Sequence, residues 1–237
     1  YIESYIPIHK VGSGDMTAYN FLNKLISFEK PLIVSTGLAT LKEVRDMVAF
    51  INQCDPSYIA DKKLALLQCS SMYPIPDDDA NLNVINTFRD EFSLPVGYSD
   101  HTVGSDAVEV AVCMGAEILE FHFTDCRENK TFRDHKVSLT PPEVHALRTK
   151  IKRIRTLQGS YEKSPTKSET DAGHVASFRR AVYPAHDIPK GKTLTHDDLV
   201  TLRPNAGVPA DQYFDLINKK ASRDLSALEV LQVGDIK

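Results

Sequence analysis

The stretch PVGYSDHTVGSDAVEVAVCMGAEILEFHFTD, residues 95–125, decides the fold class of this chain. Two short apolar runs, 95–98 and 118–123, have the character of β-strands, and the run between them, 105–115, has that of a helix. A strand, a helix and a second strand within about 30 residues form a βαβ unit, in which the two strands lie parallel in one sheet.

The same alternation extends toward both ends of the chain. Further strands are predicted at 8–12, 31–35 and 64–69, and further helices at 17–28, 41–54, 81–92 and 141–158. Capping boxes mark two of the helix starts, Thr40 with Glu43 and Thr140 with Glu143. Five strands separated by helices predict an α/β domain with a parallel sheet over residues 1–158.

The last third of the chain has a different composition and a different pattern of motifs. Residues 159–174 are polar and rich in Ser, Thr, Lys and Glu, which is typical of a linker. Beyond them, the sequence Pro-Lys-Gly at 189–191, a capped short helix at 195–199 and short strands around 220–225 predict a small β-rich domain over 175–237.

The composition excludes several classes of protein. The chain has 237 residues, of which 42% are hydrophobic and 25% charged, as in ordinary soluble globular proteins. A formal charge of −4 does not favour partners such as nucleic acid or an anionic membrane. Cys54, Cys69, Cys113 and Cys126 show neither a CxxC pair nor zinc-ligand spacing, so we expect reduced thiols and a cytoplasmic protein.

Polar or small residues follow each of the five predicted strands. They occupy positions 10–15, 35–37, 68–74, 97–102 and 120–125. In parallel α/β sheets and barrels, reactive groups gather at the carboxyl ends of the strands. Five such ends in succession predict a polar rim around a single pocket.

His101 and His122 end consecutive predicted strands. Since neighbouring parallel strands lie about 4.8 Å apart, the two imidazoles could reach one metal ion. With only two protein nitrogens, that metal would take water and substrate oxygens as its other ligands, which suits Mn²⁺ or Mg²⁺ better than structural zinc. The alternative is one structural histidine with satisfied hydrogen bonds and one exposed histidine.

Other residues of this rim suggest acid–base and anion chemistry. Glu120 and His122 are two apart on one strand and share a face, so they could exchange a proton or simply satisfy each other. Lys10 inside a barrel would need an anion such as phosphate or carboxylate, unless its side chain extends to the rim. Ser13 and Ser35, each near a glycine, could hold phosphate, although glycine after a strand is also ordinary turn chemistry.

The successive motifs of the chain resemble those of a known family. In order, HKVGSGD, PLIVSTGLAT, LLQCSSMYP, PVGYSDHTVG, EILEFHFTD and RDHKVSL resemble the signatures of the sialic acid synthases. These enzymes condense phosphoenolpyruvate with an N-acetylated amino sugar such as N-acetylmannosamine to form nonulosonic acids and phosphate. The tail, with Arg179 and Arg180, DIPKGKTLTHDDL and LRP, resembles the antifreeze-like (SAF) domain of the family, a small β-clip fold.

The resemblance implies a fold and an activity. The fold is α/β, a (β/α)8 TIM-type barrel of which this chain carries about the last five strands, so we expect the opening strands to lie outside this sequence. The activity is that of a carbon–carbon bond-forming transferase of polysaccharide biosynthesis that uses a divalent metal, usually Mn²⁺.

The resemblance also implies roles for individual residues. His101 and His122 match the metal ligands, and Glu120 matches an acidic residue beside the metal; with Lys10 and His122 it forms the expected catalytic set. The residues expected to hold phosphoenolpyruvate are Lys10, Ser13, Ser35 and Ser71, and those expected near the sugar are Asp15, Tyr73 and Asp134. Arg203 matches an arginine that one protomer delivers to the barrel of the other, which implies a domain-swapped homodimer.

Two departures from the family pattern leave the sugar open. Phe121 stands where members commonly carry Lys or Arg, and residues 127–133 replace the usual Pro-Gly-Pro approach to the aspartate. Sialic, legionaminic, pseudaminic and spore-coat-type sugars all remain candidates. The rival hypotheses are a non-catalytic relative that binds carbohydrate or acts as a scaffold, and another phosphoenolpyruvate-using barrel such as a phospho-sugar acid synthase.

Overall fold

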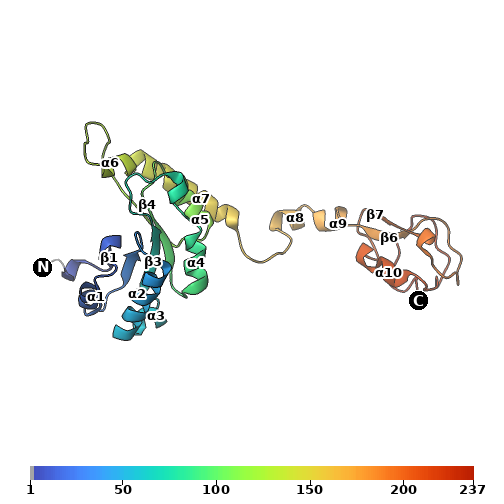
Figure 1. Ribbon diagram of the computed structural model, residues 1–237. Coiled ribbons are helices and arrows are strands. Elements are labelled where there is room, and N and C mark those ends of the chain that lie inside the picture. Colours follow the sequence, from blue (N-terminus) through green and yellow to red (C-terminus); the bar gives the residue numbers. More distant parts are fainter. Residues whose placement is uncertain (1–2) are drawn as a thin grey trace. The chain divides into compact units, whose positions relative to one another are not determined.

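Residues 3–159 form a five-stranded parallel sheet with helices between successive strands (Figure 1). The computed structural model describes residues 3–237, and the chain divides into two compact units between Gly159 and Ser160. The strands of the first unit pair in chain order: β1 (His9–Val11), β2 (Leu32–Ser35), β3 (Leu64–Cys69), β4 (Val96–Asp100) and β5 (Ile118–Phe121). A parallel sheet in strictly sequential order is the arrangement of a β/α barrel, here five strands of it.

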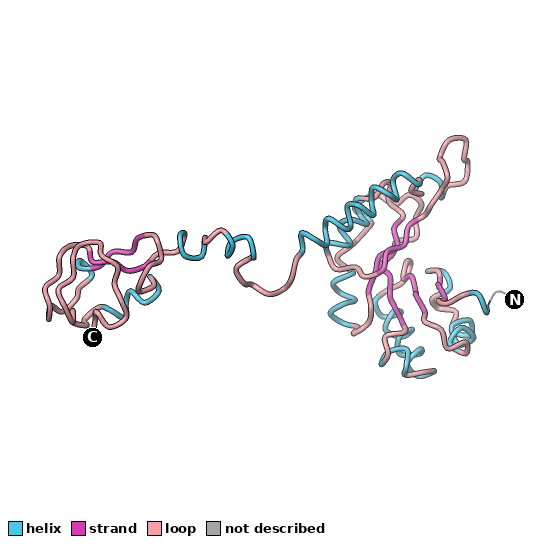
Figure 2. Tube along the Cα trace, turned by 180° about the vertical axis from the view of Figure 1, so that it is seen from behind, coloured by secondary structure: helices cyan, strands magenta, loops and turns pink. Residues whose placement is uncertain are grey.

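The helices lie close to the predicted segments; Figure 2 distinguishes them by colour from the strands and loops. They are α1 (Tyr19–Ile26), α2 (Leu41–Cys54), α3 (Ser57–Ala60), α4 (Val84–Glu91), α5 (Asp106–Cys113), α6 (Asp134–Val137) and α7 (Pro141–Gln158). The capping boxes at Thr40 and Thr140 are both present, and they start α2 and α7 at the predicted residues. The predicted α1, α4 and α5 were too long by one to three residues at each end because their outer residues lie in turns and bends.

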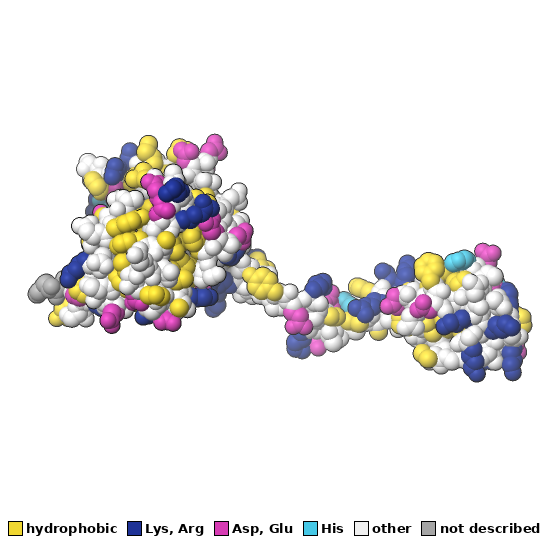
Figure 3. Space-filling model, turned by 60° about the horizontal axis from the view of Figure 1, so that its bottom comes forward, with side chains coloured by type: hydrophobic (Ala, Val, Ile, Leu, Met, Phe, Trp, Pro, Cys, Tyr) yellow, Lys and Arg dark blue, Asp and Glu magenta, His cyan; other side chains and the backbone are white. Residues whose placement is uncertain are grey.

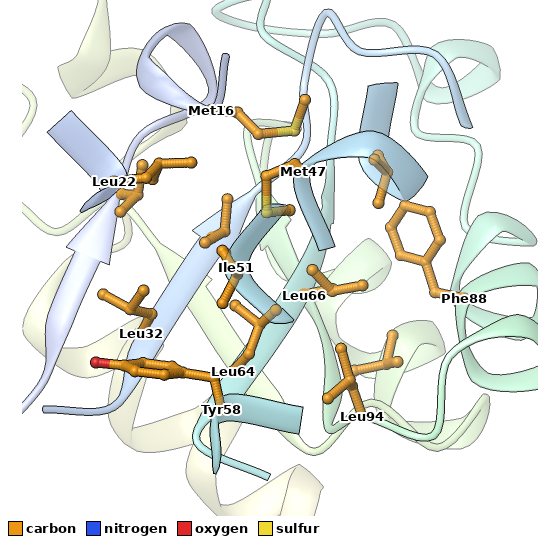
Figure 4. Close-up of a cluster of buried hydrophobic side chains, with 14 of the residues drawn as sticks. Met16, Leu22, Leu32, Met47, Ile51, Tyr58, Leu64, Leu66, Phe88 and Leu94 are labelled. Carbon is orange, nitrogen blue, oxygen red and sulfur yellow. The ribbon is translucent and has the colours of Figure 1, made fainter. Parts of the chain in front are cut away.

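The core of this unit lies between the sheet and its helices (Figure 4). Side chains alternate along each strand, so every second residue faces the helices. Leu32 of β2, together with Leu64 and Leu66 of β3, meets Met47 and Ile51 of α2 in one cluster, all of them fully buried. This amphipathic packing fixes which face of each strand is left for the site.

The opposite face of the sheet is more polar and less covered. The residues that share it are Lys10, Ile33, Ser35, Ala65, Leu67, Cys69, Gly97, Ser99, Ile118 and Glu120. A groove of about 350 Å³ runs over its apolar part. Gly97 is required here because a Cβ at this position would lie 2.3 Å from the Ile118 carbonyl oxygen. Figure 3 shows hydrophobic side chains gathered on one face of this unit.

The second unit has a small core of its own. Strands β6 (Ala181–Pro184) and β7 (Leu199–Leu202) pair antiparallel, and α8 (Lys167–Asp171), α9 (His174–Ser177) and α10 (Tyr213–Leu216) complete the helices. Val182, Ile188, Leu194 and Leu231 are almost fully buried in its hydrophobic cluster.

The structure differs from three predictions for this part of the chain. The predicted strands around 220–225 are wrong: Lys220, Ala221 and Leu225 form only isolated bridges, because the backbone crosses its neighbours at single points. The predicted helix at 195–199 is a 3₁₀ turn, His196–Asp198, closed by a capping box from Thr195. The polar segment 159–174 contains the capped helix α8.

None of the helices within residues 3–237 combines the length and the apolar character needed to cross a bilayer.

Candidate active site

Ser13, Gly37 and Ser71 converge from the ends of three consecutive strands. The Gly37 N–H donates to Ser13 Oγ at 2.9 Å. A Cβ on Gly37 would lie 2.2 Å from Ser71 Oγ and 2.8 Å from Ser13 Oγ. Two hydroxyls and a backbone segment without a side chain thus surround one small space, a chemistry suited to phosphate oxygens.

Lys10, Ser35 and Glu120 form a second group on the same face of the sheet. Lys10 Nζ lies 3.2 Å from Glu120 Oε2, and Ser35 Oγ donates to the same oxygen at 3.3 Å. Both charged side chains are about one third exposed, whereas Ser35 is buried. The anion that Lys10 meets within the chain is therefore Glu120, and Glu120 pairs with Lys10 rather than with His122.

His101 and His122 lie side by side with Tyr73 against both. The two imidazole centroids are 5.1 Å apart at an interplanar angle of 81°. The ring of Tyr73 lies 4.1 Å from that of His101 and 5.5 Å from that of His122. The predicted pair is thus brought together, with an aromatic side chain along one side.

Each imidazole has one ring nitrogen next to an anchoring oxygen. His101 Nδ1 lies 2.8 Å from the Ser70 carbonyl, to which it donates, and His122 Nδ1 lies 3.5 Å from Asp134 Oδ2. Among residues 3–237, no hydrogen bond engages Nε2 of either ring, so two nitrogen lone pairs stay available.

The two histidines differ in electrostatics. Burial lowers the pKa of His101, but hydrogen bonds with Cys69 and the Ser70 carbonyl outweigh it and raise that pKa. For His122, burial and the neighbouring His101 lower the pKa, which favours a neutral ring. Burial raises the pKa of the Cys69 thiol, yet its interactions with His101, Ser13 and Ser99 hold it below its ordinary value.

These donors suit a divalent metal with an incomplete protein ligand set. Within the described residues, no cluster of three or more His, Cys, Asp or Glu side chains is arranged to hold a metal. Two adjacent imidazoles, each with an Nε2 that makes no hydrogen bond within residues 3–237, fit an ion that takes water and substrate oxygens as its remaining ligands. His101 and His122 are the residues that would hold it.

Asp134 and Arg133 lie next to His122 and Tyr73, respectively. Arg133 lies over the Tyr73 ring, 4.9 Å from its centroid, and its Nε is 3.5 Å from Asp134 Oδ1. The structure therefore brings Tyr73 and Asp134, both expected near the sugar, to the same imidazole pair.

Two predicted residues are not joined to this group. Asp15 is exposed at the end of a 3₁₀ turn, Ser13–Asp15, and within residues 3–237 no hydrogen bond or ion pair links its carboxylate to the others. Arg203 belongs to the second unit, where its Nε donates to the Phe178 carbonyl at 2.7 Å and its guanidinium lies 5.7 Å from the Phe178 ring centroid.

Four residues near the site were not predicted from the sequence: Gly37, Cys69, Ser99 and Arg133. A signal existed for two of them. Cys69 and Ser99 lie two residues before Ser71 and His101, and strand alternation puts them on the same face. The register pairs Cys69 with Ser99 and Ser99 with Glu120 across β3, β4 and β5. The positions of Gly37 and Arg133 depend on loop paths.

Comparison with known proteins identifies the family. Residues 1–163 match the NeuB family and residues 179–237 match the SAF domain. The chain belongs to the NeuB family. The resemblance to sialic acid synthases is thereby confirmed, as is an α/β fold that combines a TIM-type half-barrel with a SAF domain.

Named relatives of this NeuB-family chain make several nonulosonic acids. It is 37% identical to the N,N'-diacetyllegionaminic acid synthase of Legionella pneumophila over 92% of this chain and 60% of that protein. It is 30% identical to the pseudaminic acid synthase of Campylobacter jejuni over 100% of this chain and 67% of the relative. The chain thus spans about two thirds or less of the length of most curated relatives it matches.

A solved structure agrees with this assignment. The crystal structure of the N-acetylneuraminic acid synthetase from Leptospira borgpetersenii, in complex with citrate, is 31% identical in sequence to this chain. It aligns with a TM-score of 0.64, covering 71% of this chain and 57% of that one.

Proposed function

We propose that this chain carries most of the active site of a synthase that condenses phosphoenolpyruvate with an N-acetylated amino sugar. The products are a nonulosonic acid and phosphate. The sugar is N-acetylmannosamine or a related 2-acetamido or diacetamido sugar. The observation that carries the proposal is the meeting of two chemistries at the strand ends: the Ser13–Gly37–Ser71 group suits an anion, and the His101–His122 pair suits a metal.

In the proposed reaction, C3 of phosphoenolpyruvate attacks the aldehyde carbon of the open-chain sugar and forms the new carbon–carbon bond. The aldehyde oxygen takes up a proton and becomes a hydroxyl. Water adds at C2. The bond between C2 and the phosphate oxygen then breaks, and inorganic phosphate leaves with the electrons of that bond. The resulting C2 becomes the ketone of the product.

The position of each residue suggests its role in these steps. Lys10, with Ser13, Ser35 and Ser71, offsets the charge of the phosphate as it leaves. Glu120, which Lys10 and Ser35 hold in place, is positioned as the base that takes a proton from the attacking water. Tyr73 and Asp134 line the sugar side. A divalent metal, Mn²⁺ or Mg²⁺, supplies Lewis acidity for the sugar carbonyl when bound at His101 and His122.

The whole enzyme is proposed to be a homodimer in the cytoplasm, with Arg203 of one protomer serving the barrel of the other. The similarity to legionaminic and pseudaminic acid synthases supports a diacetamido sugar as readily as N-acetylmannosamine.

Phosphate release from phosphoenolpyruvate tests the proposal. The assay contains Mn²⁺ and a panel of 2-acetamido and diacetamido sugars, and compares the 237-residue chain with a form extended to the length of its relatives. One preferred sugar, with phosphate and nonulosonic acid formed in equal amounts, is the expected result. Folded protein that releases no phosphate and gains no thermal stability from Mn²⁺ would instead support a non-catalytic carbohydrate-binding relative.

Replacing His122 tests the metal assignment. His122→Ala should reduce Mn²⁺-dependent turnover to background, because the imidazole pair loses one of its two nitrogen ligands. His145→Ala, on the exposed face of α7, is the matched control and should leave turnover unchanged. Unchanged turnover in the His122 variant would contradict the metal site.

A further inference from the structure

Asp134 presents its two carboxylate oxygens to different surroundings. Oδ2 lies 3.5 Å from His122 Nδ1. Oδ1 is buried and accepts no hydrogen bond from any residue between 3 and 237, although Arg133 Nε approaches it to 3.5 Å. One oxygen therefore lies beside an imidazole, and the other is buried without a hydrogen-bond donor among residues 3–237.

The loop between His122 and Leu139 holds Asp134 in this place. At its base, the Leu139 N–H donates to the His122 carbonyl at 2.8 Å, and the Thr124 N–H donates to the Leu139 carbonyl at 3.0 Å. At its top, Ser138 Oγ donates to the Asp134 carbonyl at 2.7 Å. The chain thus leaves β5 at His122, returns through α6, and brings Asp134 back over the imidazole it has just passed.

The other histidine does not need such a carboxylate. His101 donates from Nδ1 to the Ser70 carbonyl at 2.8 Å, a backbone anchor that no side-chain substitution removes. Among the described residues, 3–237, the polar group beside His122 Nδ1 is the Asp134 carboxylate. The two halves of the pair are thus oriented by different means, and only one of them depends on a side chain.

We propose that Asp134 is a positioning residue for His122 as well as a contact for substrate. Oδ2 accepts the Nδ1–H of His122 and fixes the tautomer whose Nε2 is free for a divalent metal. Carboxylates that anchor metal-binding imidazoles commonly raise metal affinity by about 10- to 100-fold. This inference rests on the proposed metal and sugar sites, and it gives one residue a task in both.

Calorimetric titration of Mn²⁺ into the full chain, without phosphoenolpyruvate or sugar, separates this from a role in sugar binding alone. Asp134→Ala should weaken Mn²⁺ binding about 10-fold or more. Asp134→Asn should weaken it less, because its amide oxygen can still accept the Nδ1–H. Asp125→Ala is the matched control, since Asp125 lies in the same loop and pairs with Lys130, with no contact to either imidazole.

The tautomer of His122 gives a second readout that needs no metal. Nitrogen-15 NMR of the metal-free chain should show His122 protonated at Nδ1 in the wild type, and a mixture of tautomers in the Asp134→Ala variant. Circular dichroism of each variant confirms that it is folded.

Three results would overturn the inference. Unchanged Mn²⁺ affinity and an unchanged tautomer in Asp134→Ala would leave the proposed function intact and reduce Asp134 to a sugar contact. Equal weakening by Ala and Asn with an unchanged tautomer would assign the effect to charge alone. A wild-type chain that binds no Mn²⁺ would contradict the metal site of the proposed function together with this inference.

Discussion

At the scale of single residues, the absence of a side chain at Gly37 shapes the candidate anion site. Its N–H holds Ser13, and the space where its Cβ would lie is the space between the hydroxyls of Ser13 and Ser71. A residue without a side chain thus contributes as much to the site as the residues that carry hydroxyls.

Gly37→Ala should therefore weaken binding of phosphoenolpyruvate about 10-fold while the protein stays folded. The added methyl displaces the two serine side chains, and hydrogen bonds to charged groups contribute about 1.5–3 kcal/mol each. Calorimetric titration measures the affinity. Gly12→Ala is the matched control, since a Cβ there meets nothing within 4 Å. Equal affinity for phosphoenolpyruvate in the two variants would contradict an anion site between Ser13, Gly37 and Ser71.

At the scale of elements, the strand ends determine what the sheet can do. Alternation along each strand gives one face to the core and the other to the site, so Leu64 and Leu66 stabilise the same strand that presents Cys69. The register then aligns Cys69, Ser99 and Glu120 across three neighbouring strands. Stability and chemistry thus depend on alternate residues of the same elements.

In the second unit, the turn that leads into β7 depends on one buried carboxylate. Burial raises the pKa of Asp198, but hydrogen bonds from Lys192, from the Thr195 N–H and from the Thr195 hydroxyl hold that pKa at about 2. The carboxylate is only 1% exposed. Its charged form is therefore the form that the folded unit prefers.

The second unit should accordingly lose stability in acid. Asp198 has a folded pKa of about 2 and an ordinary unfolded value near 3.9. A depressed folded pKa contributes stability above the unfolded value, here about 2–3 kcal/mol, which is lost as the pH falls from about 5 toward 2. Chemical denaturation monitored by NMR signals of residues 181–202 measures this loss.

Asp198→Asn should flatten that pH dependence, whereas the exposed neighbour Asp197→Asn should leave it as it is. If the two variants show the same acid profile as the wild type, Asp198 is not the group responsible.

At the scale of the whole molecule, the chain is two units with separate hydrophobic cores. The half-barrel carries the residues proposed to hold the anion and the metal, and the SAF-domain unit carries Arg203, whose Nε donates to the Phe178 carbonyl. If each Arg203 acts in the barrel of a partner, the active enzyme has to be an assembly of chains.

Complementation between variants tests that arrangement. Arg203→Ala should raise the KM for the sugar and leave phosphoenolpyruvate binding unchanged. Mixing it with His122→Ala after co-refolding should restore activity in about a quarter of the sites, because each mixed dimer then has one complete site. An absence of recovery, with mixed dimers shown by mass spectrometry, would place Arg203 in its own barrel or outside the site.

The sequence predicted much of the first unit. The five parallel strands, the capped starts of α2 and α7 and the adjacency of His101 and His122 all follow from patterns within about 30 residues. The partner of Glu120 did not follow, because Lys10 lies 110 residues away in the chain and reaches Glu120 across the sheet. The prediction of strands near Lys220 was wrong because a strand needs a run of paired neighbours, and the backbone there forms only isolated bridges with distant segments.

The sequence by itself determined the α/β class, the family and the set of residue types at the strand ends, because hydrophobic periodicity and caps are local properties. Tertiary structure decided which of those residues meet. It paired Glu120 with Lys10, returned Asp134 over His122 and used Gly37 as a spacer, since contacts across a sheet and around a loop depend on register and backbone path. Those long-range contacts turn five polar strand ends into one candidate active site.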